Sequence, residues 1–208
     1  MSIVIRPLEK SDYSYKDVVS LLHDSFQERL EQGLRYTCSS ITEEQYREKT
    51  KKGIVLVAFD EQLGELVGTM ALNFLDNKSE RCGYTEYLAI RNDVKATGIG
   101  SLLFKNIENL AIERGCPYIL SDTSVLATSA VKWHLKNGFK IVGLESYRST
   151  NYWSYVFRKQ LVPSKKWDND LYCRLRYYLS WIFIRLTRDI YGNDTIIGRL
   201  YKTIKNRW

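Results

Sequence analysis

The first half of the chain changes from a strand-like to a helix-like hydrophobic pattern and back again. Apolar and polar residues alternate over residues 3–6, which predicts an opening strand that ends at Pro7. Apolar positions then recur at helical spacing, which predicts a helix over residues 15–30 with Asp12 or Ser14 as its cap. A second helix begins near residues 40–44, with Ser40 or Thr42 as the cap.

The remaining pattern predicts a sheet with helices inserted between strands. Residues 54–59 and 66–72 are apolar runs joined by a short polar loop, as in a hairpin. The other predicted elements are strands at 84–90, 118–121, 139–144 and 152–157 and helices at 99–114 and 128–136. The order is β-α-α-β-β-β-α-β-α-β-β, so we expect an α/β protein with a single mixed sheet of the α+β kind.

A glycine-bearing turn connects the predicted strand 84–90 to the helix that follows it. Gly98 and Gly100 lie in this turn, between Lys95 and Ser101. The first turn of a helix leaves main-chain N–H groups unpaired, and the helix dipole favours negative charge there. Glycine lets an anion approach the backbone closely. The turn therefore predicts a site for a phosphate-bearing cofactor.

The composition changes after residue 160, which predicts a main domain over residues 1–160 and an extension over 161–208. Two amphipathic helices are expected in the extension. The first has one apolar face formed by Leu171, Leu175, Tyr178, Ile182 and Leu186, and the second has one formed by Ile197, Leu200, Tyr201, Ile204 and Trp208. The preferred interpretation is that these helices pack on the domain or on the partner of a homodimer. The alternative is that they form a basic surface for anionic lipid or an acidic partner.

Charge is concentrated in the extension. Residues 163–208 contain ten basic and four acidic residues, a net charge of +6, whereas residues 1–162 contain 21 basic and 20 acidic residues, a net charge of +1. This balance gives no support for nucleic-acid binding by the main domain. No apolar run approaches the ~20 residues of a membrane-spanning helix.

The cysteines and the N-terminus indicate the cellular compartment of the protein. The four cysteines are scattered without a CxxC motif or a nearby histidine pair, so we expect neither a disulfide framework nor a metal site. Residues 1–7 lack the apolar core of a signal peptide. We expect a cytoplasmic protein, with peripheral contact to the inner membrane surface as an alternative.

Two segments resemble the GNAT acetyltransferases. Residues 88–103 are similar to the cofactor loop of that family, Arg/Gln-x-x-Gly-x-Gly/Ala at the start of a helix, with Lys95 in place of Arg or Gln. Residues 130–139 resemble the family's later helix with its Lys-x-Gly-Phe ending. Two motifs in the right order are more specific than a glycine loop alone, and the resemblance covers about residues 1–160.

The resemblance implies acetyl-CoA as the co-substrate. The diphosphate is expected on the backbone of Lys95, Ala96, Thr97, Gly98, Ile99, Gly100 and Ser101. The pantetheine arm is expected beside the strand that contains Leu88, Ala89 and Ile90. A backbone N–H group near these residues would polarise the thioester carbonyl.

Two departures from the family affect catalysis. Many members have a tyrosine on the later helix that protonates the leaving thiolate, and His134 stands there in this chain. Imidazole, with a usual pKa of ~6.5, can also donate a proton, although a histidine on a helix is often a packing residue. Ala127 stands where the family often has an asparagine that contacts the pantetheine.

Glu86 is the first candidate for the base that deprotonates the amine, directly or through a water molecule. Strict alternation would place Glu86, Leu88 and Ile90 on one face and Tyr87 and Ala89 on the other. Tyr87 or Tyr84 would then be better placed if the acceptor lies on the second face. Asp122 is a weaker candidate.

The acceptor pocket is predicted to include residues 27–50 and the final strand pair. Its candidate residues are Arg29, Arg35, Tyr36, Tyr87, Tyr152 and Trp153. Arginine and aromatic side chains suit an anionic acceptor such as an amino sugar nucleotide.

These residues predict an N-acetyltransferase in which the amine of a small molecule attacks acetyl-CoA directly. No cysteine lies in a recognisable triad. Acylation of a hydroxyl group instead of an amine, and transfer of acyl groups of other lengths, remain alternatives. The alternatives are a catalytically inactive acyl-CoA-binding module, suggested by His134 and Ala127, and an acyltransferase that modifies lipid-linked glycans at a membrane surface, suggested by the basic extension.

Overall fold

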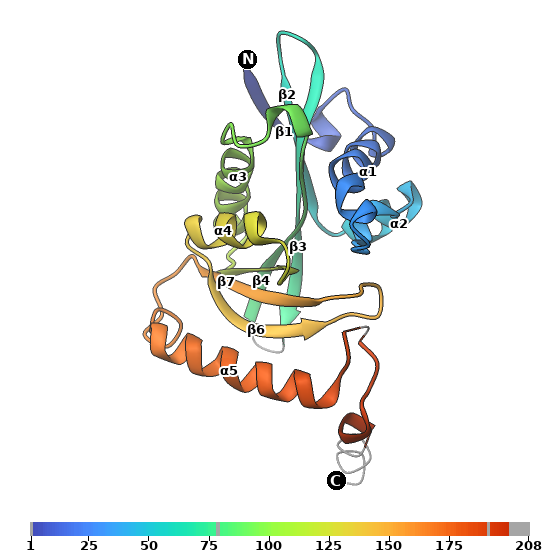
Figure 1. Cartoon of the computed structure of the whole chain (residues 1–208). Helices are drawn as coiled ribbons and strands as arrows, with labels where there is room; N and C mark the ends of the chain where they lie inside the picture. The colour runs from blue at the N-terminus through green and yellow to red at the C-terminus, as the bar shows by residue number, and fades with distance from the viewer. Residues whose placement is uncertain (1, 78–79, 191, 200–208) are drawn as a thin grey trace. The chain divides into compact units, whose positions relative to one another are not determined.

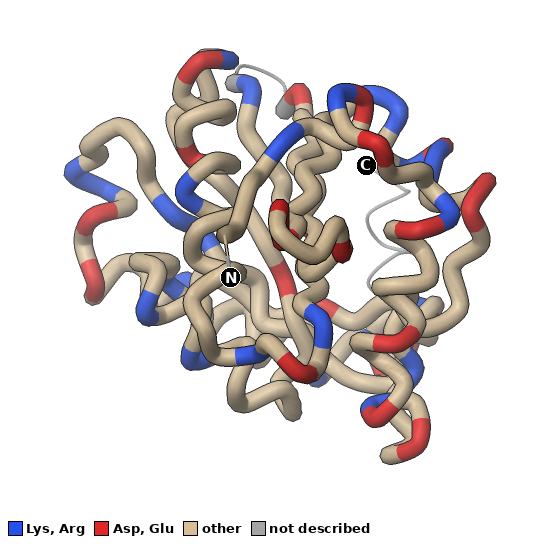
Figure 2. The backbone as a smooth tube through the Cα atoms, turned by 90° about the horizontal axis from the view of Figure 1, so that it is seen from above, with Lys and Arg blue, Asp and Glu red and all other residues tan. Residues whose placement is uncertain are grey.

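The computed structural model describes residues 2–77, 80–190 and 192–199 (Figure 1). The chain divides into two compact units, Met1–Leu120 and Ser121–Trp208. Basic and acidic residues are interspersed along the backbone (Figure 2). The domain boundary expected at residue 160 rests on composition and stays a prediction.

The first unit is built on a mostly antiparallel sheet. Its strands follow the order β1 (Ile3–Pro7), β2 (Ile54–Asp60), β3 (Glu65–Asn77) and β4 (Glu80–Ile90), and the start of β5 (Tyr118–Ser124) pairs parallel to β4. The predicted strands are confirmed, but β3 and β4 are longer than expected. Asp76 pairs with Arg81 at their ends, so part of the segment that we expect to be a polar loop is paired as strand.

Two helices lie on one side of this sheet, α1 (Tyr15–Glu31) and α2 (Glu43–Thr50) (Figure 1). Each begins with a capping box, formed by Ser14 with Asp17 and by Thr42 with Gln45, which selects between the candidate caps. An eight-residue helix is not stable by itself in water, so α2 depends on packing. Its buried residues are Thr50 and Tyr46, and Tyr46 belongs to the core cluster formed with α1 and sheet residues.

Helix α3 (Ile99–Glu113) covers the opposite side of the sheet (Figure 1). It packs closely because two glycines face it: a Cβ atom at Gly68 would lie 3.2 Å from Leu103, and one at Gly83 would lie 3.7 Å from Ala111. Just after the helix, Gly115 is left-handed, and the Cys116 N–H group is bonded to the Ala111 carbonyl.

The second unit contains the end of β5, α4 (Thr128–Lys136), β6 (Lys140–Ser146), β7 (Trp153–Gln160) and α5 (Asp170–Thr187). Strand β7 lies between β5 and β6 and is antiparallel to β6. Helix α5 packs on β6, where the Ser180 hydroxyl accepts from Leu144 N–H at 2.9 Å and donates to the Leu144 carbonyl at 3.1 Å.

Helix α5 confirms the first of the two helices predicted in the extension. Its buried residues are Cys173, Ile184 and Thr187, so the apolar face that we expected to pack is not the one that faces β6. The second predicted helix falls largely on residues 200–208, which lie outside the described residues. No helix in the described part of the chain is long and apolar enough to cross a bilayer.

Candidate functional site

The glycine turn of the first unit is held in an unusual backbone conformation. Ala96 and Gly98 both have positive φ angles, 65° and 95°, and the Thr97 hydroxyl donates to the Val94 carbonyl at 2.7 Å. Gly98 occupies the cap position of α3 and has no side chain to satisfy the first N–H groups. Helices α1, α2 and α5, in contrast, begin with a side-chain cap.

This turn presents unpaired donors to its surroundings. The N–H groups of Ser101 and Leu102 both donate to the Gly98 carbonyl at 3.0 Å. Among the described residues, the N–H groups of Ile99 and Gly100 have no acceptor. A Cβ atom at Gly98 would meet nothing within 4 Å, so the space next to it is open. The donors, the open space and the positive end of the helix dipole together form an anion site.

Strand β4 contains a β-bulge at Tyr87. Ala71 of β3 pairs with Glu86 and Thr69 pairs with Ala89, so Met70 alone lies opposite both Tyr87 and Leu88. Tyr87 has a φ angle of 58°, which is rare for a bulky residue and costs of order 1–3 kcal/mol. A strand that keeps such a conformation is held there by its surroundings, and strain of this kind is concentrated at functional sites.

The bulge corrects the alternation that we expected along β4. Glu86 pairs with Ala71, whose side chain belongs to the core cluster under α1 and α2, and Tyr87 and Ala89 belong to the same cluster. Paired residues on neighbouring strands share a face of the sheet. Glu86 and Tyr87 therefore lie on one face instead of opposite faces, because the extra residue shifts the pattern by one position.

Two further residues lie beside Glu86 and Tyr87. The Asn73 amide donates a hydrogen bond to the Glu86 carboxylate, and the Tyr46 ring meets the Tyr87 ring edge-on at 4.9 Å. The Tyr46 hydroxyl is buried without a well-formed hydrogen bond to any described residue. Burial raises the pKa of Tyr46 well above its usual value, which the nearby Thr69 hydroxyl partly offsets.

Only weak local signals point to these two residues. Tyr46 is the one apolar side chain in an otherwise polar helix, and Asn73 interrupts an apolar strand. Their meeting with Glu86 depends on the β3–β4 register and on the packing of α2, neither of which follows from the local pattern.

The end of β4 is open on one side within the first unit. Its ladder with β5 there consists of the pairs Gly83–Ile119 and Tyr84–Leu120. The predicted cofactor strand, Leu88 to Ile90, follows these pairs and has no strand neighbour on that side among the described residues of this unit. An unpaired strand edge of this kind can accept an extended, amide-containing ligand.

His134 lies in the second unit and is packed as a neutral imidazole. Its Nδ1–H group donates to the Ala130 carbonyl at 2.8 Å, and its Nε2 atom accepts from the Ser121 hydroxyl at 3.0 Å. The ring stacks on Phe157 at 4.3 Å and is 6% exposed. Burial lowers the pKa of His134 to about 4.

This pKa predicts a pH-dependent loss of stability. Between pH ~6.5 and pH ~4 the unfolded chain binds a proton at His134 and the folded chain does not, so stability falls as the pH is lowered, by up to about 3 kcal/mol. The variant His134→Gln cannot titrate. Urea unfolding of both proteins at several pH values is expected to show an excess loss of about 2–3 kcal/mol in the wild type. Parallel curves would contradict the prediction.

The candidate acceptor residues are divided between the two units. In the first unit Arg29 is half-buried on α1, and Tyr36 is buried with its ring 5.2 Å from Phe26. In the second unit Tyr152 is buried, and Trp153 lies under the Arg185 guanidinium at 4.4 Å. The structure brings Tyr87 together with Glu86, whereas a pocket that combines all six candidates stays a prediction.

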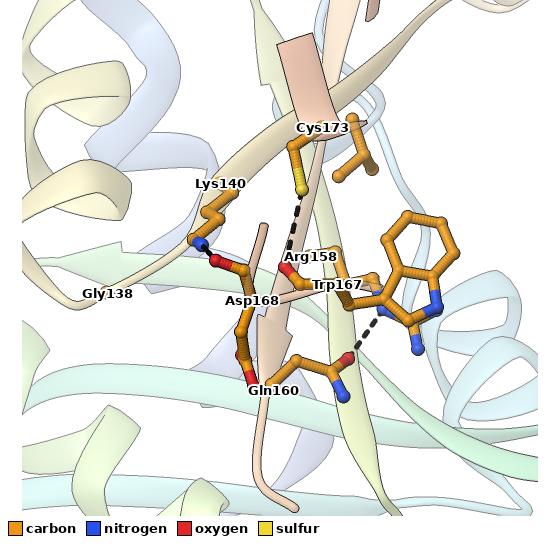
Figure 3. Close-up of a pocket in the computed structure, with 8 residues that line it drawn as sticks. Gly138, Lys140, Arg158, Gln160, Trp167, Asp168 and Cys173 are labelled. Carbon is orange, nitrogen blue, oxygen red and sulfur yellow. Dashed lines mark hydrogen bonds between the residues drawn. The ribbon is translucent and has the colours of Figure 1, made fainter. Parts of the chain in front are cut away.

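A small cavity in the second unit does not have the character of a substrate site (Figure 3). Its volume of about 90 Å³ is below the ~300 Å³ at which ligand pockets begin. Its polar groups bind one another: Lys140 donates to the Asp168 carbonyl, Arg158 donates to Gln160, and the Cys173 thiol donates to the Trp167 carbonyl. These bonds fix the segment that leads into α5.

Comparisons with known proteins agree with this geometry. The sequence profile described as the acetyltransferase (GNAT) family matches residues 15–139. No curated protein matches the sequence.

Solved structures share the fold at low identity. They include a GNAT-family acetyltransferase from Streptococcus pneumoniae (21% identity, TM-score 0.57, covering 77% of this chain and 100% of that one). The PaiA N-acetyltransferase from Thermoplasma acidophilum, in complex with coenzyme A, is 19% identical (TM-score 0.56, 77% and 99%). A GNAT-family acetyltransferase from Elizabethkingia anophelis with acetyl-CoA bound is 18% identical (TM-score 0.55, 76% and 98%).

Proposed function

Because the chain belongs to the acetyltransferase (GNAT) family, we propose that it transfers an acetyl group from acetyl-CoA to the amine of a small molecule. The observation that carries this proposal is the uncapped N-terminus of α3, where Gly98 is left-handed and the N–H groups of Ile99 and Gly100 are unpaired among the described residues. Structures of the same fold that contain coenzyme A or acetyl-CoA support the choice of donor.

The residues of the turn fit a diphosphate. The two N–H donors lie in the first turn of α3 next to the open space beside Gly98, and the exposed Lys95 adds a positive charge nearby. Residues 95–101 would hold the diphosphate mainly through the backbone, so a lysine can stand where the family has arginine or glutamine. The donor supplies the activated acetyl group as a thioester.

The bulged end of β4 would hold the arm of the donor and its carbonyl. The edge of Leu88–Ile90 can pair with the amides of the pantetheine as a further strand would. A backbone N–H group near these residues would donate to the thioester oxygen and stabilise its charge during attack. The strained Tyr87 supports this assignment, because the bulge changes the direction of the backbone donors.

We propose Glu86 as the base for the attacking amine. It lies with Tyr87 on the face below α1 and α2, and the Asn73 amide holds its carboxylate. A positioned carboxylate can take the amine proton directly or through a water molecule. The amine then attacks the thioester without a covalent enzyme intermediate, since no cysteine is assigned to the chemistry.

The proton for the leaving thiolate has no assigned source. His134 remains the candidate from the sequence, but its Nδ1 proton is bonded to Ala130 and burial opposes protonation of Nε2. To act as the acid, the ring would have to break the Ala130 bond or become charged in an apolar setting. The role of His134 therefore stays a prediction.

Aromatic and arginine side chains near the first helix support the proposal of an anionic acceptor. Arg29 and Tyr36 could hold an anionic, ring-containing amine, so an amino sugar nucleotide is the first compound to test. Simple amines and alcohols belong in the same panel.

The proposal is tested by binding and turnover measured on the same protein. Isothermal titration with acetyl-CoA is expected to show one site, and a ligand concentration of 100 Kd would raise the unfolding free energy by about 2.7 kcal/mol. A thiol-release assay across the amine panel then reports transfer. Binding without turnover on any acceptor would favour the inactive binding module, and the absence of binding would overturn the proposal.

A further inference from the structure

Helix α5 has two faces suited to packing and uses only one of them. The residues of the packed face are Cys173, Tyr177, Ser180, Ile184 and Thr187, at spacings of three and four. Ser180 bonds to Leu144 of β6, and the Tyr177 ring meets the Tyr155 ring of β7 edge-on. The opposite face is apolar and exposed to solvent. It consists of Leu171, Leu175, Tyr178, Ile182 and Leu186, with exposed fractions between 49% and 76%.

Further exposed apolar residues widen this outer face. Leu179 and Phe183 border it on one side, at 60% and 45% exposure, and Trp181 lies toward the other side. Within the second unit no other described element covers this side of α5 (Figure 1). Isolated exposed apolar residues are ordinary, but a continuous stripe along five turns of one helix marks an interaction surface.

The charges on α5 indicate which partner this surface fits. Arg174 and Arg185 are eleven positions apart, about three helical turns, so both lie along the same border of the apolar face. Arg185 also stacks on Trp181 at 5.0 Å. Residues 171–187 contain three arginines and no acidic residue, unlike the near-neutral residues 1–162.

We propose that the outer face of α5 binds the surface of a lipid bilayer with anionic headgroups. The helix would lie in the plane of the interface with its leucines and Ile182 in the acyl region, the aromatic residues at headgroup level and the arginines beside lipid phosphates. Each arginine near such a surface contributes about 1 kcal/mol, or about a fivefold gain in affinity. This inference is independent of the acetyltransferase proposal.

A second copy of the chain is a poorer fit to the same face. An antiparallel pair of α5 helices would place Arg174 of one copy near Arg185 of the other, and a parallel pair would bring identical arginines together. Residues 171–187 offer no carboxylate to neutralise either arrangement. Like charges in contact oppose association, whereas anionic lipid removes the repulsion.

Sedimentation with vesicles tests the proposal on the full chain. We expect binding to phosphatidylcholine vesicles that contain about 40% phosphatidylglycerol, little binding to phosphatidylcholine alone, and loss of binding at ~1 M salt. The double variant Arg174→Gln/Arg185→Gln is expected to bind about 25-fold more weakly. Ile182→Glu is expected to weaken binding at least tenfold, because it places a charge in the apolar face.

A matched control distinguishes binding through this face from nonspecific hydrophobic binding. Leu63 is 64% exposed in the β2–β3 loop, so Leu63→Glu makes the same kind of change at another site and is expected to leave vesicle binding unchanged. Equal binding to both vesicle types, or equal losses in Leu63→Glu and Ile182→Glu, would overturn the proposal. So would a lipid-free dimer in sedimentation velocity that Ile182→Glu dissociates. Thiol release measured without lipid reports separately on the acetyltransferase.

Discussion

Replacing Glu86 with Gln is expected to lower kcat by about 10²- to 10⁴-fold while leaving the KM for acetyl-CoA near the wild-type value. The substitution keeps the size of the side chain and its contact with the Asn73 amide but removes the proton acceptor. A loss confined to kcat identifies an interaction made in the transition state rather than in binding. Steady-state kinetics with the best acceptor of the panel measure both constants.

A second carboxylate provides the control for Glu86→Gln. Asp76 lies exposed at the far end of β3 and pairs with Arg81, so Asp76→Asn is expected to change kcat less than twofold. Asn73→Ala removes the residue that holds Glu86 and is expected to give a smaller loss than Glu86→Gln, of about tenfold. Unchanged kcat in Glu86→Gln would assign deprotonation of the amine to another group or to solvent.

Local patterns predicted most of the fold because each element has a local cause. Alternation over residues 3–6, capping boxes at Ser14 and Thr42 and the glycine stop at residue 115 are all short-range signals, and each is found in the structure. The anion turn was also predictable, because glycine readily adopts the positive φ that a tight strand-to-helix turn needs and leaves the first N–H groups of the helix uncovered.

The features that were missed depend on contacts between distant residues. The bulge at Tyr87 arises from the β3–β4 register and from the packing of Tyr46, so strict alternation assigned Glu86 and Tyr87 to opposite faces. A tyrosine is also not the residue that a pattern would assign to a left-handed position, where glycine is usual.

Helix α5 shows a second limit of pattern analysis. The periodicity of its large apolar residues identified a real stripe, but the helix packs through its other face, where the small Ser180 lies close to β6 at Gly143. A Cβ atom at Gly143 would lie 3.3 Å from the Ser180 hydroxyl oxygen, so the two elements meet where both side chains are small. Hydropathy alone predicts burial of the wrong face, because it measures side-chain polarity. It does not measure whether the side chains fit the surface of the neighbouring strand.

The proposed diphosphate site is tested by a matched pair of glycines at the two ends of α3. Gly98 and Gly115 are both left-handed, with φ angles of 95° and 71°, and a Cβ atom at either one would meet nothing within 4 Å. Gly98→Ala and Gly115→Ala are therefore expected to destabilise the fold to a similar extent, about 1–2 kcal/mol each, through backbone strain. Thermal or urea unfolding measures this shared cost.

Only Gly98→Ala is expected to weaken acetyl-CoA binding, by about 100-fold. Its methyl group would enter the space beside the N–H groups of Ile99 and Gly100. One hydrogen bond to a charged phosphate oxygen would be lost and the other weakened, which lowers the binding free energy by about 3 kcal/mol. Gly115 lies at the opposite end of the helix, where the dipole repels anions, so Gly115→Ala is expected to keep wild-type affinity. Isothermal titration of the two variants separates the effect of backbone strain from the effect of lost phosphate contacts. Equal affinities of the two variants for acetyl-CoA would show that the diphosphate does not bind at this turn, whatever the stability of each protein.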